Sequence, residues 1–223
     1  MLDANDSRVV QARLAAVLAE LSAPLPAPLK PLDPLPGMAM ARGRVHEVTG
    51  SARHVLAAAL AAGAQAEGPV LWLQPAWSGE ELCPQGLVPF VDPGALITVA
   101  CPRASDILWA AEEALCSGAV ALVLAALIAA PDLRQVRRLH RAAAEGVVRA
   151  RDGAGAGRRA PLGVLMMQEQ AESRIAGVES RWALQALPPL SEGTRWQLER
   201  LLARDAPPAG WTLQMSTAGL KAG

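Results

Sequence analysis

The sequence predicts a three-layer α/β domain in which a mostly parallel sheet lies between two layers of helices. Short apolar runs alternate with segments of helical periodicity from residue 44 to residue 168, and near-continuous apolar strands are typical of parallel sheets covered on both faces. Three more strand-like segments follow residue 180 with only turn signals between them, which predicts antiparallel strands at one edge of the sheet. The chain has 223 residues, 52% of them apolar, so it is long enough for one domain with a substantial core.

The first 43 residues predict a helix on a proline-rich strap. An amphipathic helix is expected within residues 1–22, and its apolar face supplies candidate contacts to a partner or to another protomer: Val10, Leu14, Val17, Leu18 and Leu21. Residues 23–43 form a linker in which six prolines fall within thirteen residues, so the linker is expected to run extended. The helix can dock on its own core, which is the simpler arrangement, or on a neighbouring molecule.

The core is expected over residues 44–223 and begins with alternating strands and helices. Apolar and β-branched runs predict strands over residues 45–49, 70–74, 96–100, 119–125 and 162–168. Helical periodicity predicts helices over residues 51–65, 105–116 and 132–149, and a short helix-like connector over residues 80–89. Ser105 is the expected N-cap of the second helix, and Ser117-Gly118 is its expected end.

After a Gly- and Arg-rich loop over residues 152–160, the last part of the chain predicts a different pattern. Strands are expected over residues 181–187, 195–202 and 211–216. Pro188-Pro189 and Pro207-Pro208 mark the turns between them.

Cysteine and histidine spacing and the absence of membrane signals predict a cytoplasmic protein. Residues 114–131 carry no charge, but Ser117-Gly118 divides this stretch into a helix end and a buried strand, so we expect no membrane span. No signal peptide pattern is seen at the start of the sequence. The three cysteines contain no C-x-x-C pair and the three histidines have no metal-ligand spacing, so we expect neither disulfides nor a bound metal.

The kinds of charged residue are more informative than the net charge of zero. Among 21 basic residues only Lys30 and Lys221 are lysines, which leaves 19 arginines and excludes mechanisms that need a lysine in the body of the fold. With 3% aromatic residues and no tyrosine, an RNA-binding sheet of the aromatic kind is also excluded.

Charge is unevenly distributed along the chain. Residues 67–113 hold seven acids and one base, whereas residues 134–159 hold eight arginines and two acids. Helical spacing places four arginines on one face of helix 132–149, and a fifth follows, which gives a candidate surface for DNA or an acidic partner: Arg134, Arg137, Arg138, Arg141 and Arg149. An ordinary solvent-exposed helix face without a binding role explains this spacing of arginines equally well.

Several segments resemble a known family. Residues 43–56 read GRVHEVTGSARHVL, and the segment 31–60 that contains them is similar to the opening of the RecA ATPase core. Residues 82–87, 92–97, 105–119 and 195–204 continue the resemblance, so the chain as a whole resembles the ImuA family, the RecA-like proteins of bacterial damage-induced mutagenesis cassettes.

The departures from the RecA pattern imply a pseudo-ATPase. A phosphate-binding loop needs G-x-x-x-x-G-K-[ST], whereas this loop is a shortened remnant with Gly50, Ser51, Arg53 and His54 and no lysine. Strand 119–125 ends without a carboxylate, and strand 70–74 ends in Gln74-Pro75 where the RecA pattern has its water-activating Glu. Gln168 matches the RecA Gln that senses the nucleotide, and without a nucleotide we interpret it as a retained structural group.

The resemblance implies a function without catalysis or cofactor. Its members are adaptors in DNA-damage-induced translesion synthesis, and the implied partners are RecA, an inactive Y-family polymerase homologue called ImuB, and an error-prone replicative-type polymerase. DNA binding and self-association are further expectations. Two alternatives stay open: a nucleotide-gated ATPase of the RecA/KaiC type with a non-standard site, and a cell-division inhibitor similar to SulA.

Overall fold

The computed structural model describes residues 13, 29–35, 37–79, 82–152, 160–167, 175–188, 193–216 and 219–222. The leader helix expected within residues 1–22, with its candidate contacts Val10, Leu14, Val17, Leu18 and Leu21, lies outside the described residues apart from residue 13. Gln168 and most of the Gly/Arg-rich loop also lie outside them.

The described residues form an α/β fold around one mixed sheet of nine strands. The strands are β1 (Val45–Thr49), β2 (Val70–Pro75), β3 (Leu96–Cys101), β4 (Leu122–Leu127), β5 (Leu162–Met167), β6 (Ser180–Ala186), β7 (Arg195–Ala203), β8 (Ala209–Ser216) and β9 (Gly219–Ala222). Their order across the sheet is β3-β2-β4-β5-β1-β6-β7-β8-β9. Strands β1 to β6 pair in parallel, and β7, β8 and β9 follow in antiparallel pairs. The expected mostly parallel sheet with antiparallel C-terminal strands is thus confirmed.

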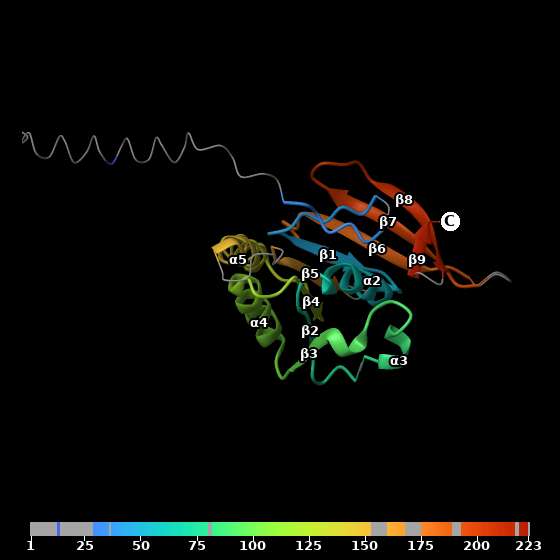
Figure 1. The fold of residues 1–223 in the computed structure, drawn as a ribbon, viewed down its shortest axis with the longest axis horizontal. Coiled ribbons are helices and arrows are strands. Elements are labelled where there is room, and N and C mark those ends of the chain that lie inside the picture. The colour runs from blue at the N-terminus through green and yellow to red at the C-terminus, as the bar shows by residue number, and fades with distance from the viewer. Residues whose placement is uncertain are drawn as a thin grey trace, which may run out of the picture.

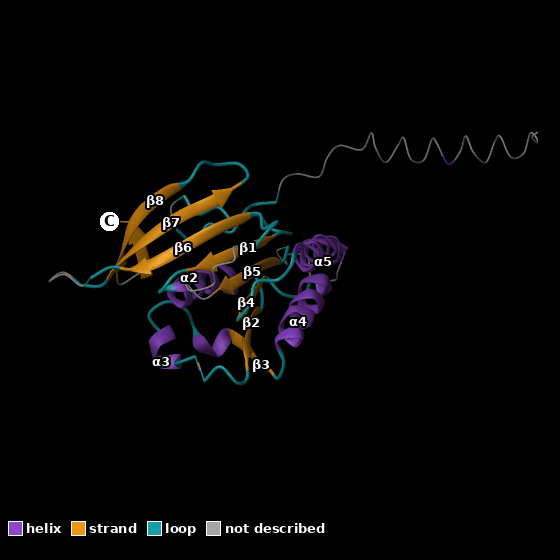
Figure 2. Ribbon diagram, turned by 180° about the vertical axis from the view of Figure 1, so that it is seen from behind, coloured by secondary structure: helices purple, strands orange, loops and turns teal. Residues whose placement is uncertain are grey.

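Helices cover both faces of the sheet. They are α2 (Arg53–Gln65), α3 (Pro84–Leu87), α4 (Ala104–Ser117) and α5 (Leu133–Asp152), with a short 3-10 helix at Pro93–Ala95. In Figure 1, α4 and α5 lie side by side on one side of the parallel strands, and α2 and α3 lie on the other. Figure 2 shows the same arrangement from behind.

Alternation along the strands divides the core between these two faces. In β4, Leu122 and Leu124 pack into the cluster that contains α2, whereas Val123 and Ala125 pack into the cluster that contains α4 and α5. Both sets are buried because successive side chains of a strand point to opposite faces. This explains why the strand has an uninterrupted apolar run.

Two expectations about α4 and β4 are wrong in detail. Ser105 does not cap α4, because the helix begins one residue earlier and its N-cap is Arg103, whose side chain donates to Asp106 at 3.0 Å. This hydrogen bond lowers the pKa of the Asp106 carboxyl. The strand expected over residues 119–125 begins at Leu122, since Gly118 ends α4 with φ +65° and the chain needs three more residues to reach the sheet.

The tail also differs from the expectation in two places. Strand β6, expected among the antiparallel tail strands, pairs in parallel with β1, and only its other neighbour β7 runs antiparallel to it. Strand β9 was not expected, because its four residues, GLKA, carry no strand alternation long enough to detect.

The second half of the proline-rich strap docks on its own core. Leu32, Leu35, Met38 and Met40 are buried in the α2 cluster, and Leu32 and Met40 form a two-residue antiparallel bridge. The chain therefore reverses direction within residues 32–40, and the expectation of an extended linker is wrong there. It is wrong because burial of four large apolar side chains against α2 lowers the free energy of the chain, whereas an extended strap would leave these side chains in solvent.

Contacts with the C-terminal strands hold this reversal in place. The guanidinium of Arg200 lies over the rings of Trp182 and Trp211 at 5.6 and 5.4 Å, and its Nη1 donates to the Gly37 carbonyl at 3.3 Å. Gly37 itself lies against Trp211. The strap and the antiparallel strands are therefore one packed unit.

A buried polar chain links the strap to β1 and β6. His46 Nε2 lies 2.9 Å from the Ala41 carbonyl, and because a carbonyl only accepts, Nε2 carries the proton. His46 Nδ1 then accepts from the Ser180 hydroxyl at 2.6 Å, and Ser180 Oγ accepts from Trp182 Nε1 at 2.8 Å. His46 and Ser180 are 1% and 4% exposed, so this Ser–His pair cannot meet a substrate and is structural.

We expect His46 to make stability depend on pH. Burial lowers the pKa of His46 from 6.5 to about 4. The unfolded chain therefore binds a proton more readily, so the free energy of unfolding falls as the pH drops below 6.5, by about 2 kcal/mol between pH 7.5 and pH 5. Urea unfolding at these two pH values should show this loss in the natural protein and a much smaller loss in His46→Gln.

His140→Gln is the matched control for that experiment. Burial also lowers the pKa of His140, but this ring is only partly buried, so the variant should keep most of the pH dependence. An equal pH dependence in His46→Gln and the natural protein would contradict the assignment.

Within the part of the chain that is described, no helix combines the length and the apolar character needed to cross a membrane.

Candidate functional site

The loop that follows β1 lies where the resemblance implies a phosphate-binding loop. Ala52 N–H donates to the Leu184 carbonyl of β6 at 2.9 Å, and Arg53 N–H donates to the Gly50 carbonyl at 3.2 Å. Gly50 has φ +100°, and a Cβ atom on it would lie 2.3 Å from the Leu184 oxygen. The loop therefore lies against β6 at a separation that only glycine permits.

Ser51 is bound to the same strand. Its hydroxyl donates to Gln185 Oε1 at 2.8 Å and accepts from Ala186 N–H at 3.0 Å, and its own N–H donates to Gln185 Oε1 at 3.1 Å. A phosphate-binding loop needs its N–H groups directed at phosphate oxygens and its hydroxyl at Mg²⁺. Here the N–H groups of Ser51, Ala52 and Arg53 all have acceptors within the chain.

Near this loop, the described ends of β2 and β4 present no carboxylate to a metal or a water molecule. Strand β2 ends in Gln74-Pro75, and the first carboxylate after β4 is Asp132. Asp132 accepts from Gln135 N–H at 2.8 Å while Gln135 Oε1 accepts from Asp132 N–H at 2.8 Å, so the two residues form a capping box at the start of α5. Among the described residues, no group of three or more His, Cys, Asp or Glu side chains could hold a metal ion.

A cavity of about 510 Å³ lies beside the first turn of α2. Arg53 and His54 line it together with Trp72 and Gln74 of β2 and Phe90, which follows α3. The His54 ring stacks on Trp72 with 6.1 Å between ring centres. Of the loop remnant, the structure thus brings Gly50 and Ser51 against β6 and places Arg53 and His54 at the cavity.

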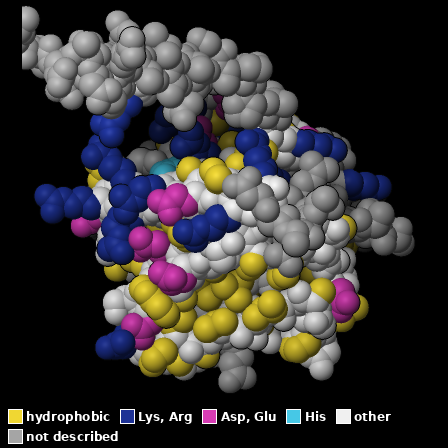
Figure 3. Space-filling view, turned by 60° about the vertical axis from the view of Figure 1, so that its left-hand side comes forward, with side chains coloured by type: hydrophobic (Ala, Val, Ile, Leu, Met, Phe, Trp, Pro, Cys, Tyr) yellow, Lys and Arg dark blue, Asp and Glu magenta, His cyan; other side chains and the backbone are white. Residues whose placement is uncertain are grey.

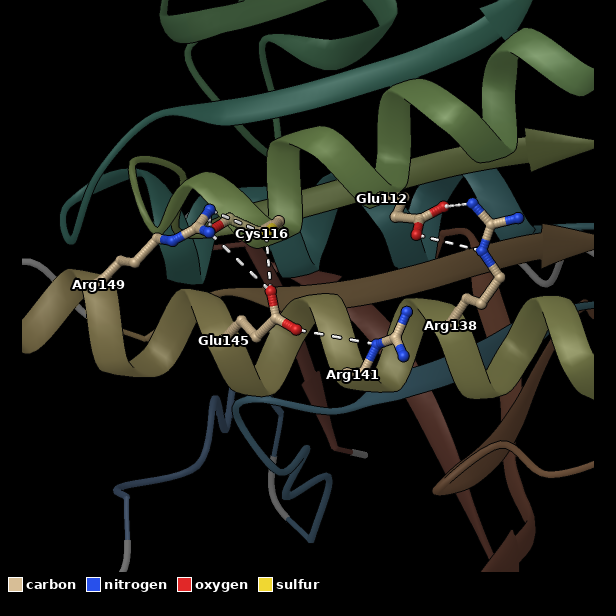
Figure 4. Close-up of polar contacts among 6 residues, drawn as sticks. All are labelled: Glu112, Cys116, Arg138, Arg141, Glu145 and Arg149. Atoms are coloured by element: carbon tan, nitrogen blue, oxygen red, sulfur yellow. Dashed lines mark hydrogen bonds and ion pairs between the residues drawn. The ribbon is translucent and has the colours of Figure 1, made fainter.

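The arginines of α5 are exposed but only partly available. Arg138 pairs with Glu112 of α4 at 2.6 Å, Arg141 lies 3.8 Å from Glu145, and Arg149 donates to the Cys116 carbonyl at the end of α4 at 2.7 Å. Figure 4 shows these side chains meeting along the contact between the two helices. Two of the five arginines, Arg138 and Arg149, thus contact α4, whereas Arg141 pairs within α5.

Arg134 and Arg137 lie in the first turns of α5, are exposed, and make no ion pair with any described residue. On the face drawn in Figure 3, basic and acidic side chains are intermingled and hydrophobic side chains gather below them. Fewer arginines are therefore available for a partner on this face than the five expected from the sequence.

Comparisons with known proteins find no match: no protein-family model fits the chain, and no curated protein is similar to it.

Two features of this region were not visible in the sequence. The attachment of the loop to β6 depends on Gln185, whose position 134 residues after Ser51 gives no local signal. The cavity combines residues from α2, β2 and the α3 region, and only the fold brings them together.

Proposed function

We propose that the protein is a non-catalytic adaptor with a degenerate RecA-like core, as the resemblance to the ImuA family implies. One observation carries the proposal: the loop that would hold phosphate is attached through its own N–H groups and the Ser51 hydroxyl to β6. A nucleotide would have to break these bonds before it could bind. The missing lysine and the two missing carboxylates also support a core that does not hydrolyse nucleotides.

The sheet topology is compatible with a RecA-like core. The resemblance implies a mostly parallel sheet, antiparallel C-terminal strands and helices on both faces, and these features are present. The first strand lies inside the sheet between β5 and β6, which differs from the two common doubly wound orders of nucleotide-binding sheets.

Exposed apolar side chains favour a binding role. Ile97 on the outer strand β3 and Trp109 on α4 are half or more exposed, and Trp77 is almost half exposed. Strand β3 contains no charge and no proline, and one of its edges has no neighbour in the described sheet. Natural proteins protect such edges, so an exposed apolar edge is typical of a surface that pairs with another chain.

The partners in this proposal are RecA and the ImuB-type polymerase homologue, with an error-prone replicative-type polymerase as a third. The apolar face of the leader segment is the candidate contact. The test is affinity capture of purified RecA and ImuB-type proteins by the full chain and by a variant lacking residues 1–28, which keeps the buried Leu32 and Leu35.

We expect the truncated protein to keep its near-ultraviolet circular dichroism spectrum, because residues 1–28 contain no Trp, and to lose capture of at least one partner. The double variant Leu14→Ser with Leu18→Ser should bind the captured partner more than tenfold more weakly. Its matched control, Gln11→Ser with Arg13→Ser, should change this affinity little. Unchanged capture of every partner by the truncated protein would contradict the role of the leader segment.

If DNA is bound, α5 is the expected surface, and Arg134 and Arg137 in its first turns are exposed and make no ion pair with any described residue. Replacing both by Gln should remove about two phosphate contacts. The slope of the logarithm of DNA affinity against the logarithm of salt concentration should then fall by about two. Arg103→Gln is the control, because Arg103 is paired with Asp106 on another helix. An unchanged salt dependence in the α5 variant would exclude this surface.

A further inference from the structure

A groove of about 240 Å³ lies between α4 and α5. On α4 its lining residues are at positions 105, 108, 109 and 112, which share one face of a helix. On α5 they are at positions 135, 138 and 139, which do the same. The groove is therefore built from two neighbouring helix surfaces, on the face of the sheet opposite to α2.

The groove combines buried leucines with an exposed aromatic ring. Leu139 is 2% exposed and Leu108 is partly buried, whereas Trp109 is 61% exposed. Tryptophan and arginine are the residues most enriched among those that dominate binding between proteins. Small-molecule sites have volumes of about 300–1,000 Å³, so a groove of about 240 Å³ suits one anchoring side chain better than a whole ligand.

The α5 side of the groove is basic. Arg134 lies one turn before Arg138 and Arg141 lies about one turn after it, so the three form a row along the helix. Arg138 pairs with Glu112 of the other helix, as Figure 4 shows, which neutralises this lining carboxylate. Arg141 is 73% exposed and 3.8 Å from Glu145, and Arg134 makes no ion pair with any described residue. The excess charge along this row is therefore positive.

A protein segment fits these features better than a strand of nucleic acid. Single-stranded nucleic acids stack successive bases on several aromatic side chains. Among the described lining residues of the groove, Trp109 is the one aromatic side chain. On the side of the molecule that carries α4 and α5, Figure 3 shows basic side chains next to a hydrophobic area, which matches a partner that is both acidic and apolar.

We propose that the groove between α4 and α5 binds an acidic segment of a partner protein that carries a large apolar side chain. The apolar side chain enters the groove beside Leu108, Leu139 and Trp109. Carboxylates that flank it pair with Arg134 and Arg141. The proposal adds a class of partner to the binding role above, but its surface is separate from residues 1–22. The groove and the leader segment can therefore fail their tests independently.

Fluorescence anisotropy with three labelled peptides tests the proposal on the full chain. The probe has the sequence EDEDLFEDE. One control peptide, EDEDGSEDE, lacks the apolar anchor, and the other, QNQNLFQNQ, lacks the charges. We expect the probe to bind at one saturable site with micromolar affinity, and each control to bind at least about tenfold more weakly. Equal binding of the probe and either control would overturn the proposal.

Trp109→Ala should weaken binding of the probe more than about tenfold, because the ring lines the groove and is exposed to a partner. Trp77→Ala is the matched control, since Trp77 is 49% exposed and does not line the groove. Far-ultraviolet circular dichroism shows whether both variants keep their secondary structure. Equal losses in the two variants, or no loss in Trp109→Ala, would place the peptide elsewhere and overturn the proposal.

The double variant Arg134→Gln with Arg141→Gln tests the charge. It should weaken the probe about tenfold at low salt and make its affinity less dependent on salt, because exposed charges at the rim of an interface act through a screened attraction. Arg204→Gln is the control, since Arg204 is 69% exposed and lies beside Glu179, outside the groove. The same salt dependence in both variants would remove the role of the α5 arginines.

Ser105→Phe tests the groove without removing Trp109 or an arginine. Ser105 is exposed and lines the groove, so the added ring should fill it and abolish binding of the probe. Unchanged binding in this variant would overturn the proposal.

Two other occupants of the groove give different results. An oligothymidine that binds more tightly than the probe, and that is also weakened by Trp109→Ala, would assign the groove to nucleic acid. A dimer in analytical ultracentrifugation that both Trp109→Ala and the probe dissociate would assign it to a second copy of the chain. Either result would overturn the assignment to an acidic protein segment.

Discussion

Replacing Arg42 by alanine is expected to lower the free energy of unfolding by about 3–5 kcal/mol. The Arg42 side chain is 1% exposed and pairs with Glu67, and its Nη1 donates to the carbonyls of Ala121 and Ala160 at 3.3 and 3.1 Å. One guanidinium thus connects the strap to the start of β4 and to the segment before β5. Its removal would leave the buried Ala160 carbonyl without this donor, would leave the Ala121 carbonyl with the Leu162 N–H, and would take the ion-pair partner from Glu67.

The neighbouring Arg44 provides the control for this experiment. Its side chain is 51% exposed and lies 3.7 Å from Glu179, so Arg44→Ala should cost less than about 1 kcal/mol. Urea unfolding followed by circular dichroism measures both variants. Similar losses in the two would show that Arg42 does not hold the strap to the sheet.

Gly50→Ala is expected to destabilise the protein by about 3 kcal/mol or more. Gly50 has φ +100°, and the added Cβ would lie 2.3 Å from the Leu184 oxygen, so the loop would have to move off β6. Because Ser51 and Ala52 bind the same strand, their hydrogen bonds would be lost as well.

Gly193→Ala separates the two causes of that loss. Gly193 has φ +112° but nothing lies within 4 Å of its Cβ position, so this variant meets only the backbone strain, about 1 kcal/mol. Thermal or urea unfolding of both variants gives the difference. If the two losses are equal, the close contact of the loop with β6 contributes nothing to stability.

Apolar runs were sufficient to predict the central strands, because a strand buried on both faces must be apolar throughout. Strands β2 and β5 lie within one residue of the expected ranges for that reason. Strand β1 also matches although it buries His46 and Glu47, and β3 matches although it is an exposed edge strand. The start of β4 was misplaced because Ala119 and Val120 are apolar although they precede the strand. Composition alone cannot show at which residue of an apolar run the pairing with the neighbouring strands begins.

Strand direction was harder to predict than strand position. The sequence of β6 contains no sign that it would pair in parallel with β1, because direction depends on the path of residues 168–179. The reversal of the strap was missed for a similar reason. Its prolines favour extended backbone, whereas burial of Leu32, Leu35 and Met38 requires a turn.

Only those features of the candidate site that depend on residues close together in the sequence could be predicted. The shortened loop and the missing lysine were visible in the sequence, as was the missing carboxylate after β4. The role of Asp132 as a helix cap and the role of Gln185 as the acceptor for Ser51 depend on geometry. The pairing of Arg138 with Glu112 likewise depends on the contact between α4 and α5, which spacing along one helix cannot show.

Isothermal titration calorimetry of the full chain with MgATP measures directly whether the loop after β1 binds a nucleotide. Because the N–H groups of Ser51, Ala52 and Arg53 are bound within the chain, we expect no binding heat at micromolar to millimolar nucleotide. Micromolar binding that Arg53→Ala removes would contradict the account, since it would show that the loop still holds phosphate.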